Sequence, residues 1–241
     1  MKKDIVTGRY TFVQKMINIF PKSLRLRTNP RRYAIEKFVK ESSSNLRAGS
    51  LILDAGAGPC PYRHMFEHCR YESTDFTNPY GLMDFVCSLD KIPRKSQTYD
   101  AILCTEVIEH VEYPQKVINE IYRILKKEGK LILTCPQEWM MHQKPYNFYY
   151  FTYFGLKSLL KNSGFKEFEI KQKGGYFWFL ADAIKFNSIL EQYKRYKFLY
   201  YPLRIIEFPF TQIIIPFIFF HLDWIDKQKD WTMGYKVLAK K

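Results

Sequence analysis

Long apolar runs, paired cysteines and acidic residues are all scarce in this chain of 241 residues. Its longest uninterrupted apolar stretch covers residues 213–220 and contains Pro216, whereas a membrane-spanning helix needs about 20 predominantly apolar residues. Pro202 and Pro209 interrupt the same region, so we expect no long helix there. Residues 1–20 contain no apolar run of the length found in signal peptides. These absences argue against a transmembrane helix and a secretory leader, and they favour a cytoplasmic protein.

The five cysteines form no C-x-x-C pair, and most of them lie in or beside apolar, strand-like segments. They are Cys60, Cys69, Cys87, Cys104 and Cys135. This placement is typical of reduced thiols in the core of a cytosolic protein and differs from the ligand spacing of zinc sites. The sequence therefore predicts neither disulfide bonds nor a bound metal ion.

Acidic residues are outnumbered, because 38 lysines and arginines face 24 aspartates and glutamates and give a net charge of +14. The imbalance is strongest in residues 1–32, where Asp4 is the single acid. The basic residues there are Lys2, Lys3, Arg9, Lys15, Lys22, Arg25, Arg27, Arg31 and Arg32. A solvated basic face explains such a segment as well as an anionic partner does. Because no nucleic-acid motif is present, an anionic membrane surface or an anionic sugar precursor is favoured over RNA.

A glycine-rich turn after a short apolar segment is the most informative feature that the chain does contain. Residues 50–61 read SLILDAGAGPCP, in which three aliphatic residues precede Asp54, Gly56 and Gly58. The aliphatic run is typical of a parallel strand that is covered on both faces. Two glycines separated by one residue let the backbone turn sharply and approach a ligand without a Cβ clash. Doubly wound α/β proteins hold adenosine-containing cofactors at such a turn.

Three residues near the turn distinguish between cofactors. A dinucleotide fingerprint requires a third glycine where this chain has Pro61. Asp54 would repel a pyrophosphate, whereas its carboxylate suits a ligand that carries an amine. Asp75 ends the next predicted strand about 20 residues further on, where ribose hydroxyls are bound. The pattern predicts S-adenosylmethionine and disfavours a nicotinamide dinucleotide.

Five segments, taken in order, resemble the class I S-adenosylmethionine-dependent methyltransferases, in particular a bacterial group that carries an E-V-x-E-H segment. They are LILDAGAGP, YESTDF, TYDAILCTEVIEHV, INEIYRILKKEGKLILTCP and YYFTYFGLKSLLKNSGF. The resemblance covers residues 51–170 and implies a methyltransferase that uses S-adenosylmethionine, without implying its substrate.

The resemblance also implies a role for each cofactor-binding position. The acid and the two glycines of the turn are expected to contact the methionine moiety, and Asp75 to bind the ribose, with Asp84 as a rival. Residues 88–89 are expected at the adenine, although Ser88 stands where many relatives have an acid. Residues 105–106 are expected beneath the sulfonium. The complete set is Asp54, Gly56, Gly58, Asp75, Ser88, Leu89, Thr105 and Glu106.

Strand-like segments alternate with helical patterns, which predicts an α/β fold: a Rossmann-like, doubly wound, mostly parallel seven-stranded sheet with helices on both faces. The predicted strands are residues 51–54, 71–74, 85–87, 100–104, 130–135, 166–171 and 235–239. One predicted helix begins at Pro114 and ends at Gly129, and another follows the N-cap Thr152 and ends at Gly164. The resemblance implies that the seventh strand is antiparallel.

The predicted domains are a basic N-terminal helical segment (1–48), a methyltransferase core (49–173), a hydrophobic insertion (174–233) and a final core strand (234–241). The insertion leaves the sheet at the edge where ligands bind in open α/β folds. Two interpretations of it remain open. It forms a helical cap that shapes the substrate pocket, or it is partly immersed in the membrane interface. Its many Trp and Tyr residues favour the second, as do four basic residues: Lys194, Arg195, Lys197 and Arg204.

Methyl transfer demands little of the protein, because the sulfonium already activates the methyl group and alignment supplies much of the rate. An oxygen acceptor also benefits from a base, and His142, in the loop after the fifth predicted strand, is our candidate. His110, in the E-V-x-E-H segment, is expected to have a structural role. We predict O-methylation of a small molecule, sugar or lipid-linked glycan precursor in the cytoplasm, with peripheral contact to the inner membrane face as an extension. The alternatives are a non-catalytic membrane-surface binding protein on the same fold and a dinucleotide-dependent oxidoreductase.

Overall fold

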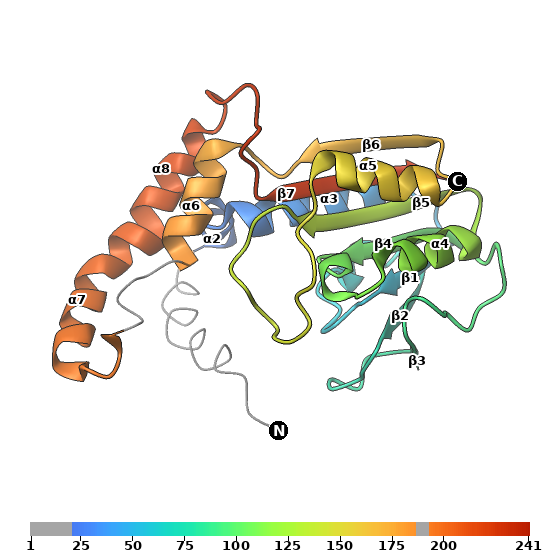
Figure 1. Ribbon diagram of the computed structural model, residues 1–241, viewed down its shortest axis with the longest axis horizontal. Coiled ribbons are helices and arrows are strands. Elements are labelled where there is room, and N and C mark those ends of the chain that lie inside the picture. Colours follow the sequence, from blue (N-terminus) through green and yellow to red (C-terminus); the bar gives the residue numbers. More distant parts are fainter. Residues whose placement is uncertain (1–20, 187–192) are drawn as a thin grey trace. The chain divides into compact units, whose positions relative to one another are not determined.

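The computed structural model of the protein describes residues 21–186 and 193–241 (Figure 1). The chain divides into two units, which are described separately below. The sheet unit comprises Ala34–Lys173 and Thr232–Lys241, and the helical unit comprises Met1–Tyr33 and Gly174–Trp231. Part of the basic N-terminal segment, including Lys2, Lys3, Arg9 and Lys15, lies outside the described residues.

The sheet unit is built on one seven-stranded sheet with the strand order β3-β2-β1-β4-β5-β7-β6. The strands are β1 (Leu51–Ala55), β2 (Arg70–Asp75), β3 (Phe85–Val86), β4 (Tyr99–Thr105), β5 (Leu125–Pro136), β6 (Glu167–Gln172) and β7 (Gly234–Lys240). β7 runs antiparallel between β5 and β6, whereas the other neighbours are parallel. The predicted doubly wound, mostly parallel sheet is therefore confirmed, together with its antiparallel last strand.

Helices cover both faces of this sheet, as Figure 1 shows. On one face, Ile35 and Val39 of α3 (Pro30–Ser44) pack against Ile52 and other aliphatic residues of the strands. On the other face, α4 (Pro114–Ile124) and α5 (Tyr153–Asn162) pack against the opposite side chains of the same strands. The alternation of side chains along each strand thus fills two separate cores. All five cysteines are free thiols; Cys60, Cys104 and Cys135 are buried, whereas Cys69 and Cys87 are half-buried.

The end of α4 differs from the prediction. The helix stops at Ile124, and the chain is already extended at Leu125, where β5 begins. Leu125 is fully buried and pairs with Tyr99 of β4. Gly129, expected to end the helix, lies within β5 instead. Strand pairing and burial of Leu125 therefore outweigh the helical preference of the lysines that follow it.

The described part of the helical unit contains α2 (Lys22–Arg27), α6 (Tyr176–Phe186), α7 (Lys197–Pro209), the π-helical turn η4 (Phe210–Ile214) and α8 (Ile215–Leu222). The Trp178 ring of α6 stacks on Phe220 of α8 at 5.1 Å between centroids, and its Nε1 donates to the Phe220 carbonyl. Asp223, directly after α8, accepts hydrogen bonds from the backbone N–H groups of Gly175 and Trp178. It thereby caps the N-terminus of α6.

The expectation that three prolines would break any long helix here is wrong. Lys197–Leu222 forms one 26-residue helix, which by length and composition alone could cross a membrane. Pro209 ends α7 directly before the wider π-helical turn, and Pro216 lies in the first turn of α8. A π-helical turn changes the local hydrogen-bond pattern, so the chain stays helical past Pro209 and Pro216 although neither proline has an N–H group to donate.

Candidate functional site

The glycine-rich turn leaves β1 at the edge of the sheet where the parallel strands end. Gly56 has φ +78°, and a Cβ at this position would lie 2.5 Å from the side chain of Val107. The Gly56 and Ala57 N–H groups both donate to the Thr74 carbonyl, which ties the turn to β2. Gly58 also has a positive φ, +50°, but no atom of the described residues lies within 4 Å of the place where its Cβ would be. Gly56 is thus required for packing, and Gly58 leaves room for a ligand.

Asp54 is a buried carboxyl group in β1, directly before this turn. Its side chain is 1 % exposed, and its Oδ2 accepts a hydrogen bond of 2.5 Å from the Tyr71 hydroxyl. Oδ1 is buried as well and has no hydrogen-bond partner among the described residues. Burial raises the pKa of Asp54 to about 7, the Tyr71 hydrogen bond opposes the rise, and the charge of Asp75 adds to it. A cation next to Oδ1 would compensate the buried charge.

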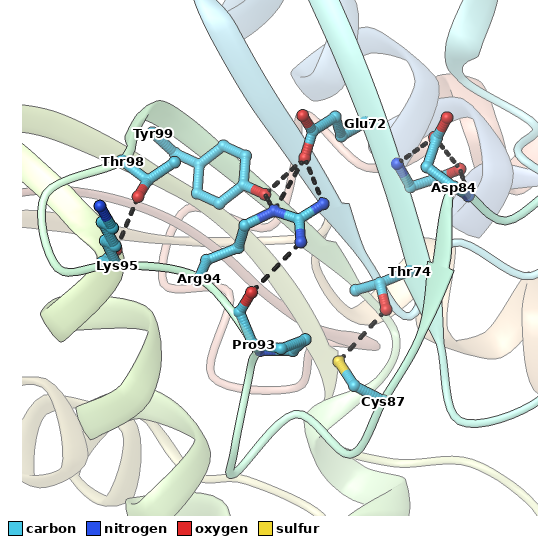
Figure 2. Close-up of polar contacts among 10 residues, drawn as sticks. Glu72, Thr74, Asp84, Cys87, Pro93, Arg94, Lys95, Thr98 and Tyr99 are labelled. Carbon is cyan, nitrogen blue, oxygen red and sulfur yellow. Dashed lines mark hydrogen bonds and ion pairs between the residues drawn. The ribbon is translucent and has the colours of Figure 1, made fainter.

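Asp75 and Asp84 are the two candidate ribose-binding acids, and their surroundings in the structure differ. Asp75 ends β2, and its two oxygens accept from the backbone N–H groups of Gly58 and Phe76. Asp84 accepts from the backbone and the hydroxyl of Ser73, as Figure 2 shows, and so holds the segment before β3 against β2. The second strand was placed correctly, which leaves Asp75 as the acid beside the glycine-rich turn.

Ser88 and Leu89 follow β3 and have contrasting exposure. Ser88 is exposed and donates to Asp90 Oδ1 at 2.5 Å, whereas the Leu89 side chain belongs to the core beneath α4. Only backbone and Ser88 side-chain atoms of this pair are therefore free to meet an adenine from the solvent side.

A polar network that sequence reasoning did not find fixes the segment after these residues (Figure 2). Glu72 Oε2 accepts hydrogen bonds from Arg94 Nη2 at 3.1 Å and from the Tyr99 hydroxyl at 2.7 Å. The Arg94 guanidinium also lies 3.8 Å from the centroid of the Phe85 ring. Pairing of β2 with its neighbours brings these residues together, and no local pattern in the sequence indicates it.

Thr105 and Glu106 lie at the end of β4, the immediate neighbour of β1, where the strand order reverses direction. Ligands of open α/β sheets bind at this reversal. Glu106 adopts φ +53°, uncommon for a residue with a side chain, and its N–H donates to the Thr134 carbonyl. Its Oε1 lies 2.5 Å from Nζ of the fully buried Lys173. No local pattern in the sequence indicates Lys173, which follows β6, 67 residues further along the chain.

His110 and His142 meet at the same edge of the sheet, with ring centroids 4.8 Å apart. His110 lies in the short helix η2 (Ile108–His110), and its Nδ1 is 2.6 Å from the Tyr146 carbonyl. His142 lies in the loop after β5, and its Nδ1 is 3.0 Å from the Met140 carbonyl. Burial lowers the pKa of His110 below its usual value, although the Tyr146 hydrogen bond opposes the shift. The expected base is thus part of a histidine pair.

The structure therefore gathers most of the predicted positions at one edge of the sheet unit. Asp54 and the glycines follow β1, Asp75 ends β2, and Glu106 follows β4. These strands are adjacent and parallel, so their carboxyl ends lie side by side. A buried carboxylate oxygen with no partner in the described part of the chain, a glycine turn and a second acid fit a ligand with an ammonium group and a ribose. S-adenosylmethionine has both.

Comparison with known proteins supports the same conclusion. Residues 54–133 match the profile of a family described as "Methyltransferase domain". The human "Probable tRNA methyltransferase 9B" is 27% identical over 124 residues, which cover 47% of this chain and 26% of that protein. The chain spans only 18% and 26% of the lengths of the first two curated relatives that it matches.

Solved structures share the fold at low sequence identity. A "SAM dependent methyltransferase from Archaeoglobus fulgidus" has a TM-score of 0.56 at 13% identity, over 87% of this chain and 94% of that one. A Haemonchus contortus phosphoethanolamine N-methyltransferase 2 in complex with S-adenosyl-L-methionine has a TM-score of 0.54 at 15% identity, over 85% and 51%. The profile match over residues 54–133 and the seven-stranded sheet support a methyltransferase domain of the class I, S-adenosylmethionine-dependent type in this chain.

Proposed function

We propose that the protein transfers the methyl group of S-adenosylmethionine to an oxygen atom of a small molecule, a sugar or a lipid-linked glycan precursor. The choice of cofactor rests on the buried Asp54 carboxyl group, whose Oδ1 has no partner among the described residues. The α-ammonium group of the methionine moiety would supply the missing partner. A dinucleotide pyrophosphate would instead meet a negative charge here, which disfavours the oxidoreductase alternative.

The other predicted residues take compatible roles around this anchor. Gly58 leaves open space for the methionine moiety, and Asp75 accepts the ribose hydroxyls at the end of β2. Ser88 and the backbone of Leu89 border the adenine. Residues 105–106 lie beneath the sulfonium, where Lys173 keeps the Glu106 carboxylate in place.

The chemistry of the transfer divides between cofactor and protein. The cofactor supplies an electrophilic methyl group, and the protein aligns the acceptor and excludes water. An acceptor hydroxyl must also lose a proton, and His142 is our candidate for the base. A carbonyl oxygen can only accept a hydrogen bond, so His142 Nδ1 carries the hydrogen that points to the Met140 carbonyl. In the neutral ring, Nε2 then holds the lone pair that takes the proton.

Calorimetric titration with S-adenosylhomocysteine tests the cofactor assignment. We expect the wild-type protein and Glu67→Gln, which alters an exposed acid, to bind it equally. We expect Asp54→Asn to bind at least about tenfold more weakly, because a charge-assisted hydrogen bond contributes roughly 1.5–3 kcal/mol. NAD serves as the negative control. Tight binding of NAD, or equal binding of S-adenosylhomocysteine by both variants, contradicts the proposal.

We further propose that the helical unit rests on an anionic membrane surface, which suits a lipid-linked acceptor. One side of the helix Lys197–Leu222 packs within its unit through Tyr200, Gln212 and Pro216, which are buried. Another side exposes an apolar stripe at helical spacing: Leu199, Leu203, Ile206, Phe210, Ile214 and Ile218. A helix with one packed side and one apolar side exposed along its length is suited to lying in the interface.

The charge of the helical unit complements such a surface. Its sequence contains 16 lysines and arginines against 7 aspartates and glutamates. Lys194, Arg195 and Lys197 are exposed at the start of the helix, and Trp224 is 69% exposed just after its end. Basic residues attract anionic headgroups, and tryptophan favours the headgroup level of a bilayer. The opposite ends of the helix thus both carry interfacial anchors.

Cosedimentation with vesicles tests this contact. We expect binding to phosphatidylglycerol vesicles, weak binding to phosphatidylcholine vesicles, and loss of binding in Ile206→Glu, which alters an exposed side chain. Tyr113→Glu, at an exposed aromatic residue of the sheet unit, is the matched control. Transfer RNA is titrated in parallel because of the name of the human relative. RNA binding without vesicle binding would overturn the membrane proposal, and vesicle binding without S-adenosylhomocysteine binding would favour the non-catalytic alternative.

A further inference from the structure

We propose that Glu109, His110 and His142 form a binding site for a divalent transition-metal ion such as Zn²⁺. One ligand atom from each of the three side chains lies within 4.8 Å of the others. Two imidazoles and one carboxylate are a common ligand set for zinc and for other divalent transition metals. No metal site was predicted from the sequence, because the cysteine spacing matches no zinc motif. The two histidines gave no local signal either, since 32 residues separate His142 from His110.

The hydrogen bonds of the two histidines place their protons suitably for an ion. Each Nδ1 lies at hydrogen-bond distance from a backbone carbonyl, that of Tyr146 for His110 and that of Met140 for His142. A carbonyl has no hydrogen to give, so each Nδ1 is protonated. In the neutral rings, Nε2 is left as the metal-binding nitrogen. Metal-binding histidines usually donate their other N–H to a carbonyl or carboxylate, which fixes the ring orientation.

The three ligand atoms have to move only slightly closer together to reach the spacing found around a bound zinc ion. His110 Nε2 is 3.8 Å from Glu109 Oε1. Two ligand atoms that each lie about 2.0–2.2 Å from a tetrahedral zinc ion are roughly 3.3–3.6 Å apart. The widest separation in the cluster, up to 4.8 Å, therefore has to shrink by about 1.2–1.5 Å. His142 lies in a loop, which can supply that movement.

The backbone already holds this loop beside η2. The N–H groups of Phe148 and Tyr149 both donate to the Glu109 carbonyl, at 2.9 and 3.2 Å. The Tyr146 carbonyl accepts from His110, so three consecutive contacts join the loop to the short helix. The ring of Tyr146 also lies 6.2 Å from that of Phe76, after β2. Glu109 and His110 are adjacent in the sequence, and these bonds hold the segment that follows His142 beside them.

The surroundings also favour a cation. The Glu109 side chain is 1% exposed, and a buried carboxylate is strongly favoured by a nearby positive charge. In the proposed function, a bound ion would replace His142 as the group that promotes loss of the acceptor proton, because it polarises a bound hydroxyl. That consequence rests on the proposed function, whereas the site itself does not.

Titration of the purified, chelator-treated protein with Zn²⁺ alone tests the site, with Co²⁺ as a spectroscopic probe. We expect one ion per chain and visible Co²⁺ absorption of the intensity typical of tetrahedral coordination. His142→Ala and His110→Ala are expected to weaken Zn²⁺ binding by at least about 100-fold. His64→Ala, at an exposed histidine of η1 (Arg63–Phe66), is expected to bind as the wild type does. Circular dichroism checks that each variant is folded.

Two results would overturn the inference. One is the absence of Zn²⁺ binding by the folded wild-type protein, and the other is unchanged binding by a folded His110→Ala/His142→Ala variant, which would place the ion elsewhere. Titration of the same samples with S-adenosylhomocysteine separates the two proposals. Cofactor binding without zinc binding rejects the metal site alone, and zinc binding without cofactor binding rejects the proposed function alone.

Discussion

Glu106 and Lys173 form an ion pair of 2.5 Å between Oε1 and Nζ, in which the lysine side chain is fully buried and the glutamate is 26% exposed. The pair joins the end of β4 to the residue that follows β6. Removing the lysine would leave a largely buried carboxylate without its charge partner.

We therefore expect Lys173→Met to lower the free energy of unfolding by about 2 kcal/mol, less than for a fully buried pair because Glu106 retains some contact with water. Lys171→Met is the matched control, since Lys171 pairs with Glu169 and both side chains are more than half exposed. We expect it to change stability by less than about 0.5 kcal/mol. Urea unfolding measures both, and equal effects would show that the buried pair has no special role.

The raised pKa of Asp54 predicts that cofactor binding depends on pH. Below about 7, the carboxyl group of the free protein is protonated, and a ligand ammonium group must displace that proton. The affinity for S-adenosylhomocysteine should fall by up to about tenfold per pH unit as pH decreases below this value, and level off above it. Calorimetry between pH 5.5 and about 8.5 tests this. A similar slope in Asp54→Asn would assign the dependence to another group.

The same carboxyl group predicts a gain in stability when its charge is removed. Its folded pKa, about 7, lies above the ordinary value of 3.8, so its stabilising contribution is complete below 3.8 and is lost as pH rises to 7. At pH 8 the ionised form costs at most roughly 4 kcal/mol. Asp54→Asn keeps an acceptor for Tyr71 and should be more stable than the wild type at pH 8 in the absence of ligand.

Thermal unfolding at several pH values measures that difference. It should be largest near pH 8 and shrink towards pH 4, where the wild-type carboxyl group is mostly protonated in the folded protein. If Asp54→Asn is less stable than the wild type at pH 8, the burial cost assigned to this residue is contradicted.

Gly56 and Gly81 offer a matched pair for the glycine-rich turn. Both have positive φ, +78° and +66°, but a Cβ at Gly56 would lie 2.5 Å from Val107, whereas a Cβ at Gly81 would have no atom of residues 21–186 or 193–241 within 4 Å. Alanine at either position brings backbone strain of about 1 kcal/mol. Gly56→Ala should cost an additional 1–3 kcal/mol or so, because the Val107 side chain must move.

Chemical unfolding of the two variants checks this prediction, and Gly56→Ala/Val107→Ala tests its cause. The double variant removes the clashing methyl groups and should recover part of the loss. Equal destabilisation by the two single variants would mean that Val107 yields without cost, and that backbone conformation alone explains the glycine.

The sequence predicted the fold well where the pattern was local. The apolar run before Asp54 and the N-cap Thr152 appear as expected, and Thr152 accepts a hydrogen bond from the Gly155 N–H. Prediction failed where distant contacts decide the outcome. Leu125 joins a strand because Tyr99 lies beside it, and a π-helical turn after Pro209 lets the helix continue.

The residues of the candidate site also fall into those that could be predicted from local sequence and those that could not. The positions of Asp54 and Asp75 followed from strand ends, whose common edge is a property of any parallel sheet. The partners of Glu106 and His110 could not be read from the sequence, because Lys173 and His142 reach them from segments 67 and 32 residues away. Only the folded chain shows that the expected base is one of two adjacent histidines.

The proposed function depends most on the binding of the cofactor's ammonium group by the Asp54 carboxylate. The most direct measurement compares, at pH 8, the affinities of wild type and Asp54→Asn for S-adenosylhomocysteine and for its analogue without the α-amino group. We expect the wild type to prefer the ligand with the amine by at least about tenfold and Asp54→Asn to lose this preference. An equal preference in both proteins would show that another residue binds the ammonium group and would contradict the account.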